Sequence, residues 1–289
     1  MTDSEPAGAL VLVGTPIGNL DDLSPRAVEA LRSADVIAAE DTRRTRALLS
    51  YAAIPAGRRL RAVRADSEAE AATRIVDEIR DGVRVAVVTD AGMPGISDPG
   101  GALVRACLDA GLAVEAVPGP SAALTALVLS GLPTDRFVFE GFLPRKGRAR
   151  AERLTAIADE TRTTVVFEAP TRLRATLTDL ADACGSDRAV AVARELTKVF
   201  EDVWRGTLAD AVTHAQSTEP RGEYVIVVGP AAARGPAREV EVEDAIRAAL
   251  ADGRSARDAA AEVAAELGVP RRRAYAAATR LRASRPRGG

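Results

Sequence analysis

Short apolar runs alternate with amphipathic stretches over the first 130 residues, and this pattern predicts strands and helices in turn. Strands are expected at 9–13, 36–38, 60–63, 83–89 and 113–117. These runs show no alternation of apolar and polar positions, which favours strands buried on both faces of a parallel sheet. Ser24, Asp41 and Ser67 stand where helices should begin, because their side chains can cap a first turn. The order predicts a compact parallel α/β domain.

The fourth expected strand runs into a long loop rich in glycine and proline, T-D-A-G-M-P-G-I-S-D-P-G. About ten residues precede the next helix, whereas most such connections have about 2 to 6. Ligands of open α/β sheets bind at the carboxyl ends of strands, where Asp90 lies. We expect Ser97 or Asp98 to cap the next helix, with Pro99 in its first turn. The stretch is interpreted as a ligand loop, and an unusual connection without a ligand is the alternative.

Beyond residue 131 several expected strands follow one another without a helix, which favours a mixed sheet. Strands are expected at 137–140, 164–168, 189–193, 199–204 and 224–228, and a helix at 170–184. After a stretch typical of a linker, three short helices are expected at 242–250, 256–267 and 271–282. The last two have the layout of a helix-turn-helix, which alanine-rich helical hairpins share.

This pattern divides the chain into two α/β domains and a small helical C-terminal segment. The expected boundaries are 1–118 for the N-terminal parallel-sheet domain, 119–230 for the mixed-sheet domain, 231–241 for a linker and 242–289 for the helical segment. With 289 residues, 47% of them hydrophobic and 28% charged, the chain is long enough to bury two cores.

Composition excludes several classes of protein. No apolar run approaches the ~18 residues of a membrane span, and a basic leader is missing, so we expect a cytosolic protein without a membrane partner. Cys107 and Cys184 lack metal-ligand spacing and are expected to be buried thiols. Because His214 is the single histidine, we expect neither a bound metal nor a histidine base.

The net charge of −2 conceals two clusters of cations. One comprises Arg145, Lys146, Arg148, Arg150 and Arg153, and the other has seven arginines between 271 and 287. Such clusters either contact phosphates or form a solvated face. Lys146 and Lys198 are the only lysines among 39 basic residues. Lysine, unlike arginine, can lose its proton when desolvated, so Lys198 is a candidate for proton chemistry, with chance as the alternative.

Three loops that follow buried strands, 14–20, 90–100 and 118–122, should meet at one edge of the parallel sheet. They contain neither G-x-G-x-x-G nor G-x-x-x-x-G-K-[ST], which disfavours a dehydrogenase or a P-loop enzyme. Seven segments resemble, in order and spacing, those of the tetrapyrrole-methylase superfamily: G-T-P-I-G-N-L, A-E-D-T-R-R-T, T-D-A-G-M-P-G-I-S-D-P-G, V-P-G-P-S-A, F-E-G-F-L-P-R-K, F-E-A-P-T-R-L and A-R-E-L-T-K. Within it, the chain is most similar to methyltransferases that modify a ribose of small-subunit ribosomal RNA.

The resemblance implies that S-adenosylmethionine binds in a cleft between the two α/β domains. It further implies methyl transfer to a cytidine 2′-hydroxyl in the decoding region of 16S rRNA of the small ribosomal subunit, by a homodimer without a metal. By this analogy the cofactor contacts are Pro16, Asp90, Ala91, Gly92, Met93, Ser121, Ala122, Ala169 and Thr197. One segment departs from the family, because D-S-E at 66–68 stands where H-N-E is common.

A ribose 2′-hydroxyl is a weak acid, so methyl transfer calls for a group that accepts its proton. Lys198, provided its pKa is depressed, and Asp41 are the first candidates, and Glu195, Glu201 and Asp90 follow. Salt bridges that only hold the fold are the alternative. With 3% aromatic residues, we expect RNA recognition to rest on arginine rather than on stacking. The candidate RNA contacts are Arg43, Arg44, Arg46, Arg145, Lys146, Arg148, Arg271, Arg272 and Arg273.

Two other functions fit the same scaffold, because a fold does not determine a function. A tetrapyrrole methyltransferase would leave the basic terminal segment without a purpose. A non-catalytic RNA-binding assembly factor would lack affinity for S-adenosylmethionine. Binding of that cofactor therefore separates the second alternative from the enzyme.

Overall fold

The structure, a computed structural model, describes residues 8–64, 66–217, 219–232 and 239–283. The chain forms two compact units, residues 1–231 and 232–289. The middle of the expected linker, 233–238, and the end of the basic tail with Arg285 and Arg287 lie outside the described residues. In the described part of the chain no helix combines the length and apolar composition that crossing a bilayer requires.

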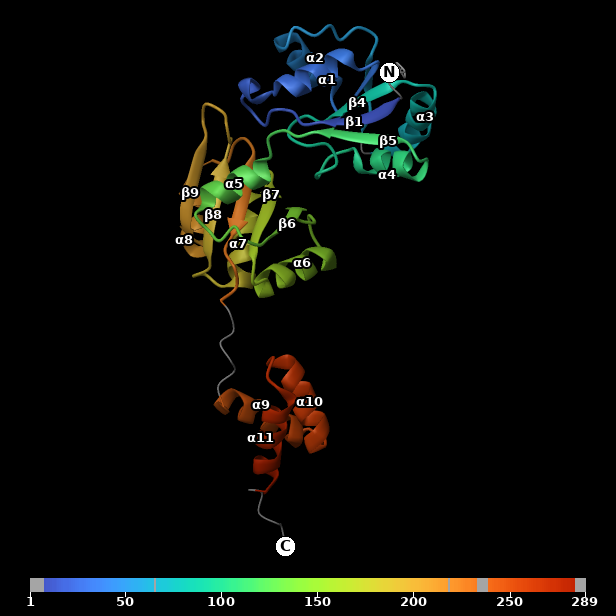
Figure 1. The fold of residues 1–289 in the computed structure, drawn as a ribbon. Coiled ribbons are helices and arrows are strands. Elements are labelled where there is room, and N and C mark those ends of the chain that lie inside the picture. The colour runs from blue at the N-terminus through green and yellow to red at the C-terminus, as the bar shows by residue number, and fades with distance from the viewer. Residues whose placement is uncertain (1–7, 65, 218, 233–238, 284–289) are drawn as a thin grey trace. The chain divides into compact units, whose positions relative to one another are not determined.

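The first five strands form one parallel sheet in the order β3-β2-β4-β1-β5 (Figure 1). The strands are β1 (Ala9–Val13), β2 (Val36–Ala39), β3 (Leu60–Ala62), β4 (Arg84–Val88) and β5 (Ala113–Val117). Every strand expected in this region is present. The central strands are buried almost throughout, as their unbroken apolar runs predict.

Helices cover both faces of the parallel sheet. These helices are α1 (Pro25–Ser33), α2 (Thr42–Tyr51), α3 (Glu68–Arg80) and α4 (Gly101–Asp109). Leu31 of α1 packs on one face, and Ile79 of α3 and Leu103 of α4 pack on the other (Figure 1). The neighbouring strands β1 and β4 lead into α1 and α4, so the chain leaves these two strands toward opposite faces. At such a switch point open α/β sheets bind their ligands.

The second sheet is mixed, in the order β6-β7-β10-β8-β9. β6 (Phe137–Phe142) and β7 (Thr163–Glu168) are parallel, whereas β10 (Tyr224–Val228), β8 (Ala189–Arg194) and β9 (Asp202–Thr207) add antiparallel pairs. The helices of this region are α5 (Ala122–Ser130), α6 (Arg148–Asp159), α7 (Leu173–Cys184) and α8 (Leu208–Ser217). α5 packs on one face, and α7 and α8 pack on the other. The two-domain α/β fold expected from the sequence is confirmed.

Two expectations for this region are wrong in detail. The basic run after residue 145 contains the helix α6, which was not expected, and the parallel pairing of β6 with β7 requires such a crossover. The expected strand at 199–204 begins instead at Asp202. Val199 and Phe200 lie in a loop with 93% and 71% of their surface exposed. Their apolar character suggested a buried strand that the chain does not form.

The outer part of the mixed sheet holds the single tryptophan and the single histidine. Trp204 of β9 stacks on His214 of α8, with ring centroids 5.3 Å apart and planes inclined by 15°. A Cβ atom at Gly206 would lie 2.6 Å from the indole ring, so the glycine makes room for it. Cys107 and Cys184, both on helices, are free thiols.

The second unit is a small helical bundle with its own core. It contains α9 (Glu239–Ala251), α10 (Ala256–Glu266) and α11 (Arg271–Ala283). Val242, Ile246 and Val263 are buried together with alanines from all three helices. α9 begins before the expected residue 242, inside the stretch interpreted as linker. The three expected helices are present.

Candidate active site

The loops after β1, β4 and β5 come together at the edge of the parallel sheet. Thr15 N donates to Gly92 O at 2.9 Å and Gly92 N donates to Thr15 O at 3.1 Å, which ties the first two loops. Gly14 N donates to Val117 O at 2.9 Å, which ties the first loop to the end of β5. The sequence predicted that these three loops share one edge, and the structure brings them into contact.

Glycines allow this close approach. A Cβ atom at Gly14 would lie 2.5 Å from Gly119 N and 2.7 Å from Met93 Sδ. A Cβ atom at Gly119 would lie 2.7 Å from the carbonyl carbon of Gly14. Gly92 has a φ of 77°, which any other residue adopts with difficulty. Larger residues here would push the loops apart.

The loop after β4 is held from α3. Oε1 of Glu68 accepts hydrogen bonds from the backbone N of Gly100 at 2.8 Å, of Ala102 at 2.9 Å and of Leu103 at 3.2 Å. These amides belong to the first turn of α4, whose orphan donors a carboxylate satisfies well. Glu68 ends the D-S-E segment that departs from the family pattern.

The expected start of α4 is therefore wrong. The helix begins at Gly101, and Gly100 occupies the N-cap position with a φ of 136° and no side-chain cap. Ser97, Asp98 and Pro99 belong to the loop instead. The cap comes from a residue distant in sequence, so a local capping signal could not reveal it.

The second domain reaches this edge through the loop 195–201. Oγ1 of Thr197 accepts a hydrogen bond from Asn19 N at 3.0 Å, and a Cβ atom at Gly18 would lie 2.5 Å from Lys198 Cγ. Glu195 and Thr197 have φ values of 49° and 66°, a left-handed conformation unusual for residues with side chains. Such strain is often found at functional sites.

A cavity of about 260 Å³ opens between these loops and the second domain. It is lined by 15–18 of the first loop, by Arg44 of α2, by 89–91 at the end of β4, and by Lys198 and Glu223. Pro16, Asp90 and Ala91 of the expected cofactor contacts thus lie on its wall, and Thr197 adjoins it. Ser121 caps α5, and Ala122 packs against the core between α5 and the mixed sheet.

The ammonium group of Lys198 is held between two carboxylates. Nζ donates to Glu195 Oε1 and to Glu223 Oε2, both at 2.8 Å. Burial lowers the pKa of Lys198, but these two hydrogen bonds outweigh it, and the net pKa is raised. The hydrogen bond from Lys198 lowers the pKa of Glu195. The condition set for Lys198 as a proton acceptor, a depressed pKa, is therefore not met, because Glu223, 25 positions away, adds a second negative partner.

Asp41 is similarly engaged. Its carboxylate accepts hydrogen bonds from the side chain and the backbone N of Arg43, which lower its pKa to about 2. Asp90 accepts a hydrogen bond from Asp41 N at 3.2 Å and lies 3.5 Å from Arg44 Nε. Burial nevertheless raises the pKa of Asp90. Hydrogen bonds and ion pairs among these side chains thus stabilise the connection between β2 and α2. This is the structural role that was considered for Asp41 as the alternative to catalysis.

Asp98 stands out among the carboxylates of the site. Burial raises its pKa to about 7, and the negative charges of Glu40, Asp90 and Glu223 act in the same direction. Within the described residues its side chain makes no hydrogen bond or ion pair. The sequence suggested only a helix cap here, because the carboxylates near Asp98 come from other elements of the fold.

The basic candidates divide between ion pairs and unpaired side chains. Arg43 and Arg44 pair with Asp41 and Asp90. In the second unit Arg273 pairs with Glu239. The candidates exposed without an ion pair in the described ranges are Arg46, Arg145, Lys146, Arg271 and Arg272. Ala169 lines a different cavity, beside Phe142 and Arg145.

The described residues contain no group of three or more histidine, cysteine, aspartate or glutamate side chains arranged to hold a metal ion. The acidic groups around Asp90 therefore present a negative field without the geometry of a metal site. Such a field favours a cationic ligand.

Solved methylase structures share the fold of the first unit. Diphthine synthase superposes with a TM-score of 0.61 at 17% identity, covering 77% of this chain and 90% of that chain. Cobalt precorrin-4 methyltransferase gives 0.59 at 20%, covering 79% and 98%. Uroporphyrin-III C-methyltransferase from Thermus thermophilus, complexed with S-adenyl homocysteine, gives 0.55 at 21%, covering 77% and 97%. The chain therefore has the two-domain fold of these methylases.

The chain belongs to the tetrapyrrole methylase family, since the model described as Tetrapyrrole (Corrin/Porphyrin) Methylases matches residues 9–212. Curated relatives named ribosomal RNA small subunit methyltransferase I match almost end to end. The relative from Synechocystis sp. is 44% identical over 96% of this chain and 99% of its own length. The Xylella fastidiosa relative is 49% identical over 93% and 98%, and the Mycobacterium tuberculosis relative is 46% identical over 98% of both. The family resemblance inferred from the motifs is confirmed.

Proposed function

We propose that the protein transfers a methyl group from S-adenosylmethionine to the 2′-hydroxyl of a cytidine in 16S rRNA of the small ribosomal subunit. The observation that carries this proposal is the near full-length similarity, at 44–49% identity, to relatives named ribosomal RNA small subunit methyltransferase I. The meeting of three glycine-containing loops at one sheet edge, two of which line a cavity, supports it, because a methyltransferase needs such a site for its donor. An rRNA substrate also implies a cytoplasmic location.

The residues present fit the proposed cofactor. The donor is a cation, and the carboxyl groups of Asp90 and Glu223 lie on the cavity wall. Backbone amides and carbonyls of glycine-rich loops can contact the nucleoside and amino-acid parts of a ligand without intervening side chains. The proposed contacts remain Pro16, Asp90, Ala91, Gly92, Met93, Ser121, Ala122, Ala169 and Thr197.

When bound, S-adenosylmethionine supplies a methyl group on a positively charged sulfur atom, which becomes a neutral thioether on transfer. The main demand on the protein is to align donor and acceptor, which can contribute a large part of the acceleration. Gly14, Gly119 and Glu68 fix the conformation of the loops at the edge of the parallel sheet, and these loops would hold S-adenosylmethionine. The loop 195–201, tied to Asn19, would close the cavity from the second domain.

The ribose proton needs an acceptor near neutral pH. In the arrangement described, Asp41 and Glu195 have lowered pKa values, and the raised pKa of Lys198 keeps its ammonium protonated. We therefore favour Asp98, which lies in the donor loop 90–100 near Asp90 and Glu223 of the cavity wall, and whose pKa burial raises to about 7. Lys198 and Glu195 would then position the loop 195–201 between the domains.

For the homodimer, we propose the outer face of α5 as the contact. Leu124 and Val128 are 51% and 73% exposed on this helix, whose sequence A-A-L-T-A-L-V-L-S is apolar almost all round. Helices of that kind are normally buried. Sedimentation of the wild-type chain and of Val128→Glu tests this, and a monomeric wild-type protein would contradict it.

The deciding experiment is methyl transfer from labelled S-adenosylmethionine to small ribosomal subunits and to naked 16S rRNA, followed by mapping of the modified ribose. We expect label on one cytidine 2′-oxygen. No incorporation into either substrate would overturn the proposal. RNA binding without cofactor affinity would instead indicate an assembly factor, and transfer to a tetrapyrrole would indicate the other branch of the family.

A further inference from the structure

A second and larger cavity, of about 860 Å³, lies in the second domain at the connection between β6 and α6. Its walls include Phe142 and Arg145 from that connection, Ala169 after β7, and Arg172 and Asp179 on the α7 side. The segment F-E-G-F-L-P-R-K, prominent among the motifs, thus forms one side of this hollow. Of the nine proposed donor contacts, Ala169 alone lies on its wall.

The base of this cavity is a closed network of charges. Arg150, 9% exposed, donates to Asp179 Oδ2 at 2.8 Å, to Pro144 O at 3.0 Å and to Thr176 Oγ1 at 3.0 Å. Thr176 in turn donates to the buried Glu168 at 2.5 Å. Because these groups satisfy one another, they hold the shape of the cavity and leave its binding chemistry to the rim.

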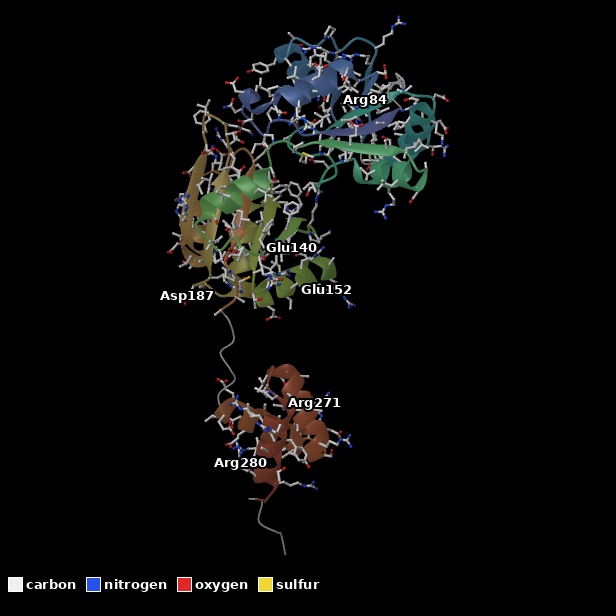
Figure 2. The ribbon with its side chains drawn as sticks, in the orientation of Figure 1. Arg84, Glu140, Glu152, Asp187, Arg271 and Arg280 are labelled. Carbon is white, nitrogen blue, oxygen red and sulfur yellow. The ribbon has the colours of Figure 1, made fainter. Side chains whose placement is uncertain are left out.

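Two neighbouring cations at this cavity lack an ion pair in the described part of the chain: Arg145 lines the cavity, and Lys146 is the next residue. Arg148 pairs with Glu152 at 2.6 Å and Arg153 pairs with Glu140 at 2.7 Å, and both acids are labelled in Figure 2. Arg145 and Lys146, in contrast, are exposed and make no ion pair with any residue that the structure describes. Of the five cations in this segment, these two are therefore available to an anion.

An exposed aromatic ring lies beside these cations. Phe142 is 53% exposed on the cavity wall, and its ring meets the edge of Phe167 at a centroid distance of 5.7 Å. Of the five phenylalanines of the chain, Phe142 and Phe200 are more than half exposed, and Phe142 is the one on the wall of this cavity. An aromatic platform next to unpaired cations is typical of proteins that bind unpaired nucleotides. Our expectation that stacking would play no part rested on composition and overlooked this placement.

The cavity adjoins the loop proposed to hold the methyl donor. A Cβ atom at Gly141 would lie 3.0 Å from Ser97 Oγ, so the residue before Phe142 touches the loop 90–100. Gly141 has a φ of 63° and follows an irregularity in the pairing of β6 with β7. This bend sets Phe142 where an acceptor strand could run from the cavity toward the donor.

We infer that this cavity binds an unpaired nucleotide of the RNA substrate, with a base against Phe142 and a phosphate between Arg145 and Lys146. The inference rests on the proposed function and deepens it, because it names the surface that selects single-stranded RNA. The charged groups that line the first cavity pair with one another, Arg44 with Asp90 and Lys198 with Glu223, whereas this second cavity has a cation free to attract a phosphate. Donor and acceptor would thus enter from different domains.

The test measures binding of a fluorescein-labelled, cytidine-containing single-stranded RNA 10-mer to the full chain by anisotropy. We expect Phe142→Ala to weaken binding about tenfold, as removal of one stacked base does. Arg145→Ala/Lys146→Ala should weaken it similarly and lower the salt dependence. Phe137→Ala is the matched control, since Phe137 lies on the same strand outside the cavity. Phe142→Leu keeps an apolar side chain if the alanine variant fails to fold.

Calorimetric titration with S-adenosylmethionine separates this inference from the proposed function. Unchanged cofactor affinity together with weakened RNA binding in the Phe142 and Arg145/Lys146 variants supports it. Wild-type RNA affinity in both variants overturns it, and so does a selective loss of cofactor affinity, which would make the hollow part of the donor site. If the wild-type protein methylates small subunits and Phe142→Ala does so with unchanged KM for them, the inference alone fails. If the wild-type protein methylates nothing, the proposed function fails.

Discussion

The two cavities of the first unit differ in the charged or ionisable groups that are left unpaired near them, a carboxyl group at one and basic side chains at the other. The smaller one lies among Asp90, Asp98 and Glu223, with Lys198 and Arg44 already held by carboxylates. The larger one has Arg145 and Lys146 unpaired at its rim, and the charges at its base are neutralised. A sulfonium donor is a cation and RNA is a polyanion, so each cavity matches a different reactant. The net charge of −2 for the whole chain does not reveal this difference between the two cavities.

The largest effect should come from removing the carboxyl group of Asp98. Asp98→Asn should lower kcat about 100-fold at pH 8, since proton acceptors contribute roughly that much or more. The wild-type rate should rise with pH through about 7, where Asp98 loses its proton, and the variant should lose this rise. Rates measured from pH 5.5 to 8.5 with saturating substrates test this. An unchanged profile in the variant would remove Asp98 as the acceptor.

The same group should affect stability in a defined direction. The pKa of Asp98 is raised from 3.8 to about 7 on folding, chiefly by burial, so the folded state binds more protons than the unfolded state between these values. Its contribution to stability is therefore greatest below pH 3.8 and is lost as the pH rises through about 7. Asp98→Asn should melt at a higher temperature than wild type at pH 8, with a smaller difference at pH 5. Equal melting temperatures at both values would contradict the raised pKa.

A methyl group at Gly14 should distort the smaller cavity, which is proposed to bind the donor, and should leave the larger cavity unchanged. In Gly14→Ala the added carbon meets Gly119 and Met93, so the loops must separate. We expect the Kd for S-adenosylmethionine to rise about tenfold, or about 1.4 kcal/mol, by calorimetry. Gly101→Ala is the control, because a Cβ atom there meets nothing within 4 Å. Equal affinity in both variants would mean that the close approach of the loops does not shape the donor site.

Substitution of Glu68 should affect the same donor site as Gly14→Ala, but by a smaller amount. Glu68→Ala removes the acceptor for three amides of α4 and should destabilise the fold by about 1 kcal/mol, as loss of a helix cap does. It should raise the KM for S-adenosylmethionine a few-fold with little change in kcat. Glu68→Gln keeps an oxygen acceptor and should restore much of the KM. A purely structural role would change the melting temperature in Glu68→Ala and leave the KM alone.

The smallest expected effect concerns the helical C-terminal unit. Arg271 and Arg272 are exposed at the start of α11, whereas Arg280 pairs with Glu239 and Glu243. Figure 2 labels Arg271 and Arg280. If each of the two arginines binds one phosphate, Arg271→Ala/Arg272→Ala should reduce the salt slope of binding to 16S rRNA by about 1 per phosphate. Arg280→Ala should leave the slope unchanged. Equal slopes in all three proteins would place the RNA-binding surface elsewhere.

The sequence predicted most of the fold because its strands are continuous apolar runs with local start and stop signals. Every strand of the parallel sheet was expected, and so was the meeting of its three loops. The helix α6 was not predicted because it begins within the basic run and its apolar face is narrow, with Ile157 as its buried apolar side chain. The strand expected at 199–204 was misplaced because Val199 and Phe200 are apolar yet exposed.

The chemistry of the site was harder to predict, because it depends on residues distant in the chain. The pKa of Lys198 is raised partly by Glu223, and the first turn of α4 is capped by Glu68. Asp98 looked like a cap until the fold placed Glu40 and Glu223 near it. Local sequence gives residue types and loop positions, whereas protonation follows from charges that only the fold brings together.

The stacked pair in the mixed sheet gives a natural optical reporter. Trp204 is the single tryptophan of the chain and lies against His214 between β9 and α8. Its fluorescence therefore originates in the second domain alone. A denaturation followed by the fluorescence of Trp204 would record the unfolding of the mixed sheet, whereas circular dichroism would record the loss of all helices. A difference between the two midpoints would show that the halves of the enzyme unfold independently.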